Sequence, residues 1–85
     1  MQTVMIDGSL YTTPKELHQA LKRLLSLPDY YGMNADALND CLSERSFPVN
    51  LWIMSRGSGE VSDAVSMIRA VVEDNGGMVK ELPGA

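Results

Sequence analysis

The order of apolar segments in the second half of the chain limits its fold more than any other feature. A largely apolar run, Val49–Met54, is typical of a buried strand, and 78–82 is typical of a second, shorter one. Between them, from about residue 60 to residue 74, apolar residues recur at helical spacing. A helix that joins two strands of one sheet implies a parallel pair with a right-handed crossover. The chain is therefore predicted to contain a parallel sheet.

The first half of the chain predicts one more strand and two helices. Residues 3–6 read as a short buried strand. Thr13 can cap a helix in which Pro14 takes the first position and Glu16 the place of a capping-box acid. This helix is expected to end before Pro28, because the residue that precedes a proline avoids helical geometry.

A second helix is expected from about Asn34, which can serve as its N-cap, to about Glu44. The predicted fold class is α/β: a three-stranded parallel sheet packed with about three helices, in the order β-α-α-β-α-β. The middle strand is expected at the centre of the sheet and the last strand at an exposed edge. With 85 residues, the chain is long enough for one small domain, residues 1–85.

The same patterns predict which side chains fill the core. Trp52 and the three methionines Met5, Met54 and Met67 lie in segments with core-like patterns. Cys41 falls on the apolar face of the second helix, where a buried structural thiol is expected.

Charge and cysteine content exclude several classes of function. Seven Lys and Arg against eleven Asp and Glu give a net charge of −4, which argues against direct nucleic-acid binding and suits a basic protein partner. The single cysteine permits no internal disulfide, which favours the cytoplasm. No stretch resembles a signal peptide or is long and apolar enough to span a membrane, so no membrane partner is expected.

The second helix carries acidic and apolar side chains on opposite faces. At about 100° per residue, Leu38 and Leu42 fall on one face of the helix. Asp36, Asp40 and Glu44, spaced four apart, form a row on the other side, which we call the acidic row. Like charges at this spacing destabilise a helix by roughly 0.2–0.5 kcal/mol per pair.

No Lys or Arg occurs between residues 24 and 44, so nothing within the segment neutralises the acidic row. The row has two interpretations, a solvated helix face or a docking surface for a cationic site. Tyr30 and Tyr31, in the turn before the helix, favour the second, because tyrosine offers a rigid amphipathic contact. They are also compatible with packed turn residues.

Residues 27–42, with the pattern Leu-Pro-acid-Tyr-Tyr-Gly-x-Asn-x-Asp-Ala-Leu-x-Asp-Cys-Leu, resemble the central motif of the barstar family. The similarity continues upstream through Leu17-His18-Gln19-x-Leu21-Lys22 and weakly into the first strand, which together cover about half the chain. Barstar-type proteins are intracellular inhibitors of the ribonuclease barnase. Their fold is a small three-stranded parallel sheet with helices, in agreement with the order of elements above.

The resemblance implies that the loop and the second helix plug the active site of a secreted ribonuclease. Asp40 would be the principal contact and would occupy the position of an RNA phosphate among basic residues. Tyr30 would pack against the catalytic histidine, and Asp36 would pair with a second basic residue. Gly32, Asn34 and Ser43 would supply close backbone and polar contacts.

The expected partner is a basic, extracellular-type ribonuclease related to barnase, bound as a 1:1 complex. The predicted partner-binding residues are Tyr30, Tyr31, Gly32, Asn34, Asp36, Asn39, Asp40, Ser43, Glu44 and Glu73.

The chain departs from the family pattern in three places. Asn39 stands where the family has a tryptophan, and Ala70 where it has a glutamate that reaches the enzyme, although Glu73 follows one turn later. The segment between the middle strand and the last helix is shorter, so the family's short extra helix is expected to be absent. These departures point to a ribonuclease related to barnase and not necessarily to barnase itself.

Two other functions remain open at this stage. The fold could serve immunity against a non-ribonuclease toxin or a regulatory contact, and Asn39 and Ala70 leave room for that. A small acid-base or metal-dependent enzyme would have to use Asp36 and Asp40, which lack further ligands, a matched base and a nucleophile. One histidine, His18, and one cysteine make neither a zinc site nor a Cys-His pair. We therefore expect no enzyme, no catalytic residue, no metal site and no cofactor.

Overall fold

The computed structural model describes residues 2–45 and 48–82. Its elements follow the predicted order β-α-α-β-α-β, with one short 3₁₀ helix, Gly8–Leu10, that the sequence patterns did not predict. The strands and α-helices are β1 (Gln2–Asp7), α1 (Pro14–Leu24), α2 (Ala35–Ser43), β2 (Val49–Ser55), α3 (Gly59–Asp74) and β3 (Met78–Glu81). Three residues separate β2 from α3, so the predicted absence of an extra helix there is confirmed.

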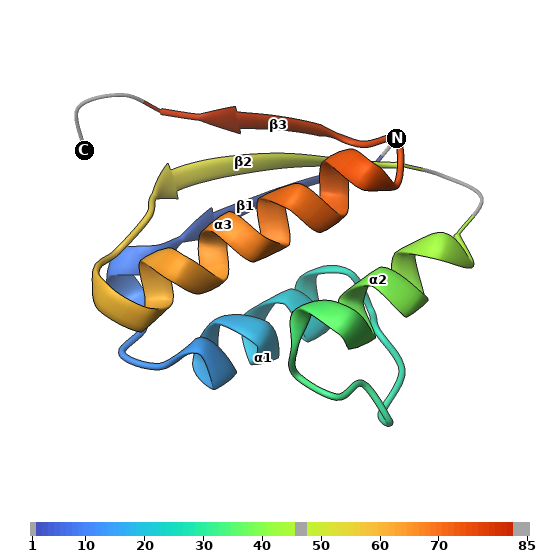
Figure 1. Ribbon diagram of the computed structural model, residues 1–85, viewed down its shortest axis with the longest axis horizontal. Helices are drawn as coiled ribbons and strands as arrows, with labels where there is room; N and C mark the ends of the chain where they lie inside the picture. Colours follow the sequence, from blue (N-terminus) through green and yellow to red (C-terminus); the bar gives the residue numbers. More distant parts are fainter. Residues whose placement is uncertain (1, 46–47, 83–85) are drawn as a thin grey trace.

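The three strands form one parallel sheet in the order β1-β2-β3, which confirms the predicted fold class and the central place of the middle strand. Leu51 of β2 lies opposite Val4 of β1 on one side and Val79 of β3 on the other. In Figure 1, α3 crosses in front of the strands, and α1 and α2 lie below it.

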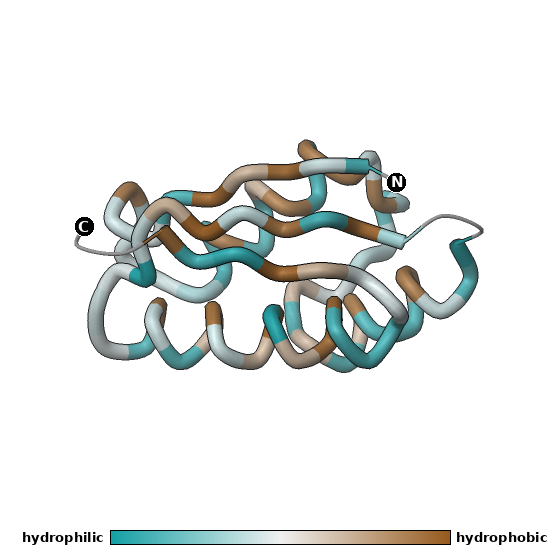
Figure 2. Tube along the Cα trace, turned by 90° about the horizontal axis from the view of Figure 1, so that it is seen from above, coloured by the Kyte–Doolittle hydropathy of each residue, from teal (hydrophilic) through white to brown (hydrophobic). Residues whose placement is uncertain are grey.

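One face of the sheet is buried against the helices and the other carries exposed side chains. Leu51 and Ile53 are almost completely buried, whereas Met54, next in sequence, is 38% exposed, because successive residues of a strand point to opposite faces. Figure 2 shows the alternation of apolar and polar residues along the strands. The ring of Trp52 lies on the open face, half-buried, with the Lys80 ammonium 5.1 Å from its centroid.

The prediction that Met5, Met54 and Met67 lie in the core is therefore wrong. Met5 and Met54 belong to the open face of the sheet, and Met67 lies on α3 beside a groove that faces α2. Met5 and Met67 are each 57% exposed. The sequence pattern of a strand shows that successive residues face opposite sides of the sheet. It does not show whether a second layer covers the side that faces away from the helices. Trp52 is likewise only half-buried.

The core joins all three helices to the buried face of the sheet. α1 contributes Leu17 and Leu21, α2 contributes Leu38, and α3 contributes Val65 and Ile68, each of which is at most 1% exposed. Burial of such side chains contributes roughly 1.5–3 kcal/mol each before entropy is counted. The acidic helix α2 is thus attached to the molecule through its apolar side.

The N-terminus of α1 forms the capping box that the sequence predicts. The Thr13 hydroxyl accepts the backbone N–H of Glu16 at 3.3 Å, and the Glu16 carboxylate accepts the N–H of Thr13 at 3.1 Å. Thr12 donates to the same carboxylate from its N–H and its hydroxyl, which lowers the pKa of Glu16. By contrast, Ser58 at the N-cap of α3 makes no side-chain capping bond.

Thr13→Ala is expected to lower the free energy of unfolding by about 1 kcal/mol, because the N–H of Glu16 loses the hydroxyl that accepts its hydrogen bond. Ser58→Ala is the matched control, since the hydroxyl that it removes caps nothing, and its effect should stay within about 0.5 kcal/mol. Urea unfolding of both variants measures the difference. Equal losses would show that the capping bond does not stabilise α1.

Candidate functional site

The loop before α2 begins where α1 is sharply terminated. Ser26, in the left-handed region with φ 53°, donates its N–H to the Arg23 carbonyl, and Leu27 donates to the Lys22 carbonyl at 2.9 Å. These two bonds form a Schellman motif, which satisfies carbonyls at the end of the helix. Leu27 is buried, and the chain therefore leaves α1 in one defined direction.

Tyr30 and Tyr31 point to opposite sides of the loop. Tyr31 donates its N–H to the Pro28 carbonyl at 3.0 Å, which closes a turn. The side chain of Tyr31 is only 4% exposed, whereas that of Tyr30 is 81% exposed. The structure thus places one predicted partner-binding tyrosine on the surface and the other in the core.

A buried hydrogen bond ties this loop to α1. The Tyr31 hydroxyl lies 2.5 Å from Nδ1 of His18 and 3.4 Å from the carbonyl oxygen of Asn34. Burial lowers the pKa of His18, so the imidazole is neutral at pH 7, and it raises the pKa of the Tyr31 phenol. The pair was not predicted, although a histidine between the apolar Leu17 and Leu21 positions was the available signal.

Asn34 starts α2 as its sequence position predicts. Its side-chain oxygen accepts the N–H of Ala37 at 2.8 Å, and its side-chain amide donates to the Gly32 carbonyl at 3.2 Å. Gly32 is exposed, and a Cβ there would come within 3.3 Å of the Ala37 methyl. The entry to α2 is therefore fixed by Asn34 and crowded at Gly32.

α2 separates its two faces as the helical wheel predicts. Leu38 and Leu42 are buried, while the predicted partner-binding residues of this helix and its C-cap are exposed: Asp36, Asn39, Asp40, Ser43 and Glu44. The Ser43 hydroxyl donates to the Asp40 carbonyl at 2.9 Å, so it is engaged with its own helix.

The carboxylates of the acidic row form no ion pair with any residue that the structure describes. All ion pairs within this part of the chain lie elsewhere, on Asp29, Glu73 and Glu81. Arg45, which follows the row, donates instead to Gln2 and to the Leu25 carbonyl. The row is therefore a strip of exposed, unneutralised carboxylates on a helix whose other side is anchored.

Asn39 joins α2 to the C-terminal end of α3. Its side-chain oxygen accepts a hydrogen bond from the Asn75 amide at 2.9 Å, and the same amide donates to the Val71 carbonyl at 2.8 Å. Glu73 is exposed and pairs with Arg69 at 3.5 Å, and Ala70 is also exposed. The predicted contacts on α2 and α3 thus lie on connected elements.

Side chains that could hold a metal do not cluster in the described parts of the chain. Residues 2–45 and 48–82 contain no group of three His, Cys, Asp or Glu side chains placed to hold a metal. Cys41 is half-buried, and burial together with Glu44 and Asp40 raises the pKa of its thiol. Over the same residues no helix is long and apolar enough to cross a bilayer.

Comparison with known proteins agrees with the resemblance in the central motif. A family model described as Barstar (barnase inhibitor) matches residues 1–74, which include the loop and the acidic row. The chain is also similar to a Bacillus subtilis protein named "Putative ribonuclease inhibitor YrdF", with 49% identity over 43 residues. That match covers 51% of this chain and 47% of the relative, so it spans about half the relative's length.

The stability of the fold is expected to decrease as the pH falls below His18's ordinary pKa of 6.5. The pKa of His18 is lowered in the folded state, so the unfolded chain binds its proton first. The stabilisation that follows from this pKa difference is fully present above pH 6.5. It is lost as the pH falls toward the lowered pKa of His18 in the folded state.

Urea unfolding at pH 7.5 and pH 5.5, values of about one unit on either side of the unfolded pKa, measures this effect. His18→Gln should remove most of the decrease in the free energy of unfolding between these two pH values. The carboxyl groups of Glu16 and Glu81, whose pKa values are lowered from 4.5, lose their contributions in a more acidic window. An unchanged pH dependence in the variant would contradict the assignment to His18.

Tyr31→Phe is expected to destabilise the fold by about 1–3 kcal/mol, because it leaves a polar ring nitrogen of buried His18 without its partner. Tyr30→Phe removes the same hydroxyl from an exposed ring and should change the free energy of unfolding by less than about 0.5 kcal/mol. Denaturant unfolding of the two variants at pH 7.5 is the measurement, at a pH about one unit above the ordinary pKa of histidine. The prediction fails if the two losses are equal.

Proposed function

The chain belongs to the barstar family, and on that premise we propose that it inhibits a secreted ribonuclease related to barnase. The inhibitor inserts the loop between α1 and α2, together with α2 itself, into the enzyme's active site as a 1:1 complex. It acts by occupying the site and catalyses no reaction, and the single cysteine is consistent with action in the cytoplasm.

The observation that carries this proposal is the unneutralised acidic row on an anchored helix. A ribonuclease site that binds RNA phosphates is lined by cationic groups, and a fixed strip of carboxylates complements such a surface. Because α2 is held through Leu38 and Leu42, little conformational entropy is lost when the row docks.

Asp40 takes the central place in the row and mimics an RNA phosphate. It is exposed between Asp36 and Glu44, one helical turn from each. A carboxylate can accept two hydrogen bonds from an arginine, and such bonds are strong once the pair is removed from water. Asp36 then pairs with a second basic residue of the enzyme.

Tyr30 contributes the aromatic contact of the loop, because its ring is almost fully exposed in the free protein. Tyr31 acts from inside the fold, where its bond to His18 holds the loop in position. Gly32 and Asn34 offer backbone and amide groups at the entry to α2, and Ser43 lies near its end. Docking is thus spread along the loop and one helix.

Asn39 is one of the positions at which this chain departs from the family pattern. Asn39 makes its hydrogen bond to Asn75, so its amide supports the junction of α2 and α3 while its outer side remains exposed. An interface with asparagine here buries less aromatic surface than one with tryptophan. This favours a cognate ribonuclease that is related to barnase but has a differently shaped site, with Glu73 as an additional contact.

Asp40→Ala is expected to weaken inhibition of a barnase-type ribonuclease by roughly 30- to 3,000-fold. This corresponds to about 2–5 kcal/mol for truncating one partner of a buried charge pair, a range that measurements on barnase–barstar itself helped to establish. Asp74→Ala, which removes an exposed carboxylate from the end of α3, is the matched control and should change inhibition by less than about threefold.

Inhibition constants for wild type and both variants should be measured in one buffer, because charge pairing is screened by salt. Equal constants for Asp40→Ala and wild type would refute the assigned role of Asp40. Failure of the wild-type chain to inhibit any barnase-type ribonuclease would instead favour the same fold acting on a non-ribonuclease partner, for which Asn39 and Ala70 leave room.

A further inference from the structure

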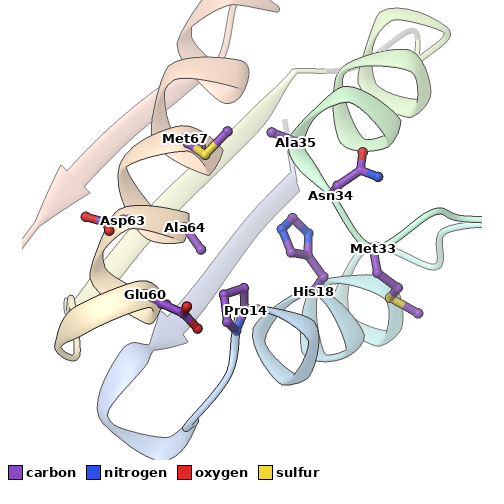
Figure 3. Close-up of a pocket in the computed structure, with 9 residues that line it drawn as sticks. All are labelled: Pro14, His18, Met33, Asn34, Ala35, Glu60, Asp63, Ala64 and Met67. Atoms are coloured by element: carbon purple, nitrogen blue, oxygen red, sulfur yellow. The ribbon is translucent and has the colours of Figure 1, made fainter.

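A groove of about 390 Å³ opens beside the N-terminus of α2, where α1, α2 and α3 meet (Figure 3). Its walls are largely apolar, and it carries two carboxylates and a histidine but no Lys or Arg. The residues that line it are Pro14, His18, Met33, Asn34, Ala35, Glu60, Asp63, Ala64 and Met67. The groove therefore offers hydrogen-bond acceptors, and none of its lining residues is a Lys or Arg that could donate to them.

The imidazole of His18 faces this groove with one nitrogen free. Its side chain is 96% buried, and Nδ1 is engaged by Tyr31, whereas Nε2 has no hydrogen-bond partner among the described residues. In the same part of the chain no fully buried side-chain nitrogen or oxygen lacks a partner, so Nε2 is not sealed off. In Figure 3 the ring rises from α1 into the space between Pro14 and Asn34.

The hydrogen bonds of Tyr31 are compatible with a proton on Nδ1 of this imidazole. The carbonyl oxygen of Asn34 can only accept, so its 3.4 Å contact with the Tyr31 hydroxyl is a bond only if that hydroxyl donates to it. In that arrangement the hydroxyl accepts from Nδ1 of His18, which then carries the ring proton. With this tautomer Nε2 is an acceptor that is directed at the groove.

Glu60 places a carboxylate on the rim of the same groove. It lies in the first turn of α3, and Figure 3 shows its side chain directed toward Pro14 and the floor of the groove. Met67 extends from α3 toward Ala35 across the gap, while the carboxylate of Asp63 points away from His18. Acceptors beside a thioether and small apolar side chains suit a cationic group on an apolar stem.

We propose that this groove receives a Lys or Arg side chain of the protein that docks on α2. The stem would lie against Met67 and Ala64, and the charged head would donate hydrogen bonds to Nε2 of His18 and to Glu60. The groove is continuous with the docking helix, because Asn34 and Ala35 line the groove and also form the start of α2. This inference rests on the proposed function and adds to it a second contact for a basic side chain.

The first experiment compares two charge-removing substitutions on one helix in the complex with a barnase-type ribonuclease. Glu60→Gln should weaken binding by about 10- to 150-fold, as expected for a charge-assisted hydrogen bond. Asp74→Asn removes the same charge from an exposed carboxylate of α3 that does not line the groove, and it should change binding by less than about twofold. Equal effects, or no effect of Glu60→Gln while Asp40→Ala still weakens binding, would overturn the groove contact and leave the proposed function intact.

The second experiment probes the groove without a ribonuclease. Titration with n-butylammonium, with n-butanol as the uncharged control, is followed through the ¹⁵N resonance of His18 Nε2 and the methyl resonance of Met67. Saturable shifts with the cation alone, reduced in Glu60→Gln, are expected, and shifts that are absent or equal for the two probes would overturn the inference. If n-butylammonium binds but Glu60→Gln leaves the complex unchanged, the groove takes free alkylammonium ions and the protein side chain is excluded. If the wild-type chain binds no ribonuclease at all, both the proposed function and this partner assignment fail.

Discussion

The hydrogen bond between His18 and Tyr31 is the contact on which the geometry of the candidate docking surface depends. It joins the middle of α1 to the loop, and the same hydroxyl reaches the carbonyl of Asn34 at the start of α2. With Tyr31 held inside, the adjacent Tyr30 is directed outward, and Asn34 is placed to cap the next helix. One buried polar pair thus determines where the aromatic and acidic contacts of the surface lie.

The acidic row illustrates how a surface can be unfavourable in isolation and useful in a complex. Asp36, Asp40 and Glu44 repel one another along the helix, and none of them forms an ion pair with a described residue. The packing of Leu38 and Leu42 holds α2 in place despite that repulsion. A basic partner would relieve the repulsion on binding, and it would be attracted from a distance at low salt, as barnase–barstar pairs illustrate.

Local chemistry made much of this arrangement predictable. The capping box at Thr13, the cap at Asn34 and the two-faced pattern of α2 depend on near neighbours in the chain, and the structure contains all three. The features that could not be predicted depend on how the helices and strands pack against one another. Met5 and Met54 are exposed because no element within residues 2–45 and 48–82 covers their side of the sheet. The contact between His18 and Tyr31 spans thirteen positions of the chain. The groove beside α2 likewise exists only where three helices converge.

The central claim is that α2 occupies the phosphate-binding site of a ribonuclease, and competition with an active-site ligand tests it most directly. The affinity of this chain for a barnase-type ribonuclease should be measured with increasing concentrations of a mononucleotide that fills the enzyme's active site. The account predicts that the apparent dissociation constant rises in proportion to one plus the ratio of nucleotide concentration to its own dissociation constant, the relation expected for exclusive binding. A dissociation constant that does not change with saturating nucleotide would place the inhibitor elsewhere on the enzyme and contradict the account.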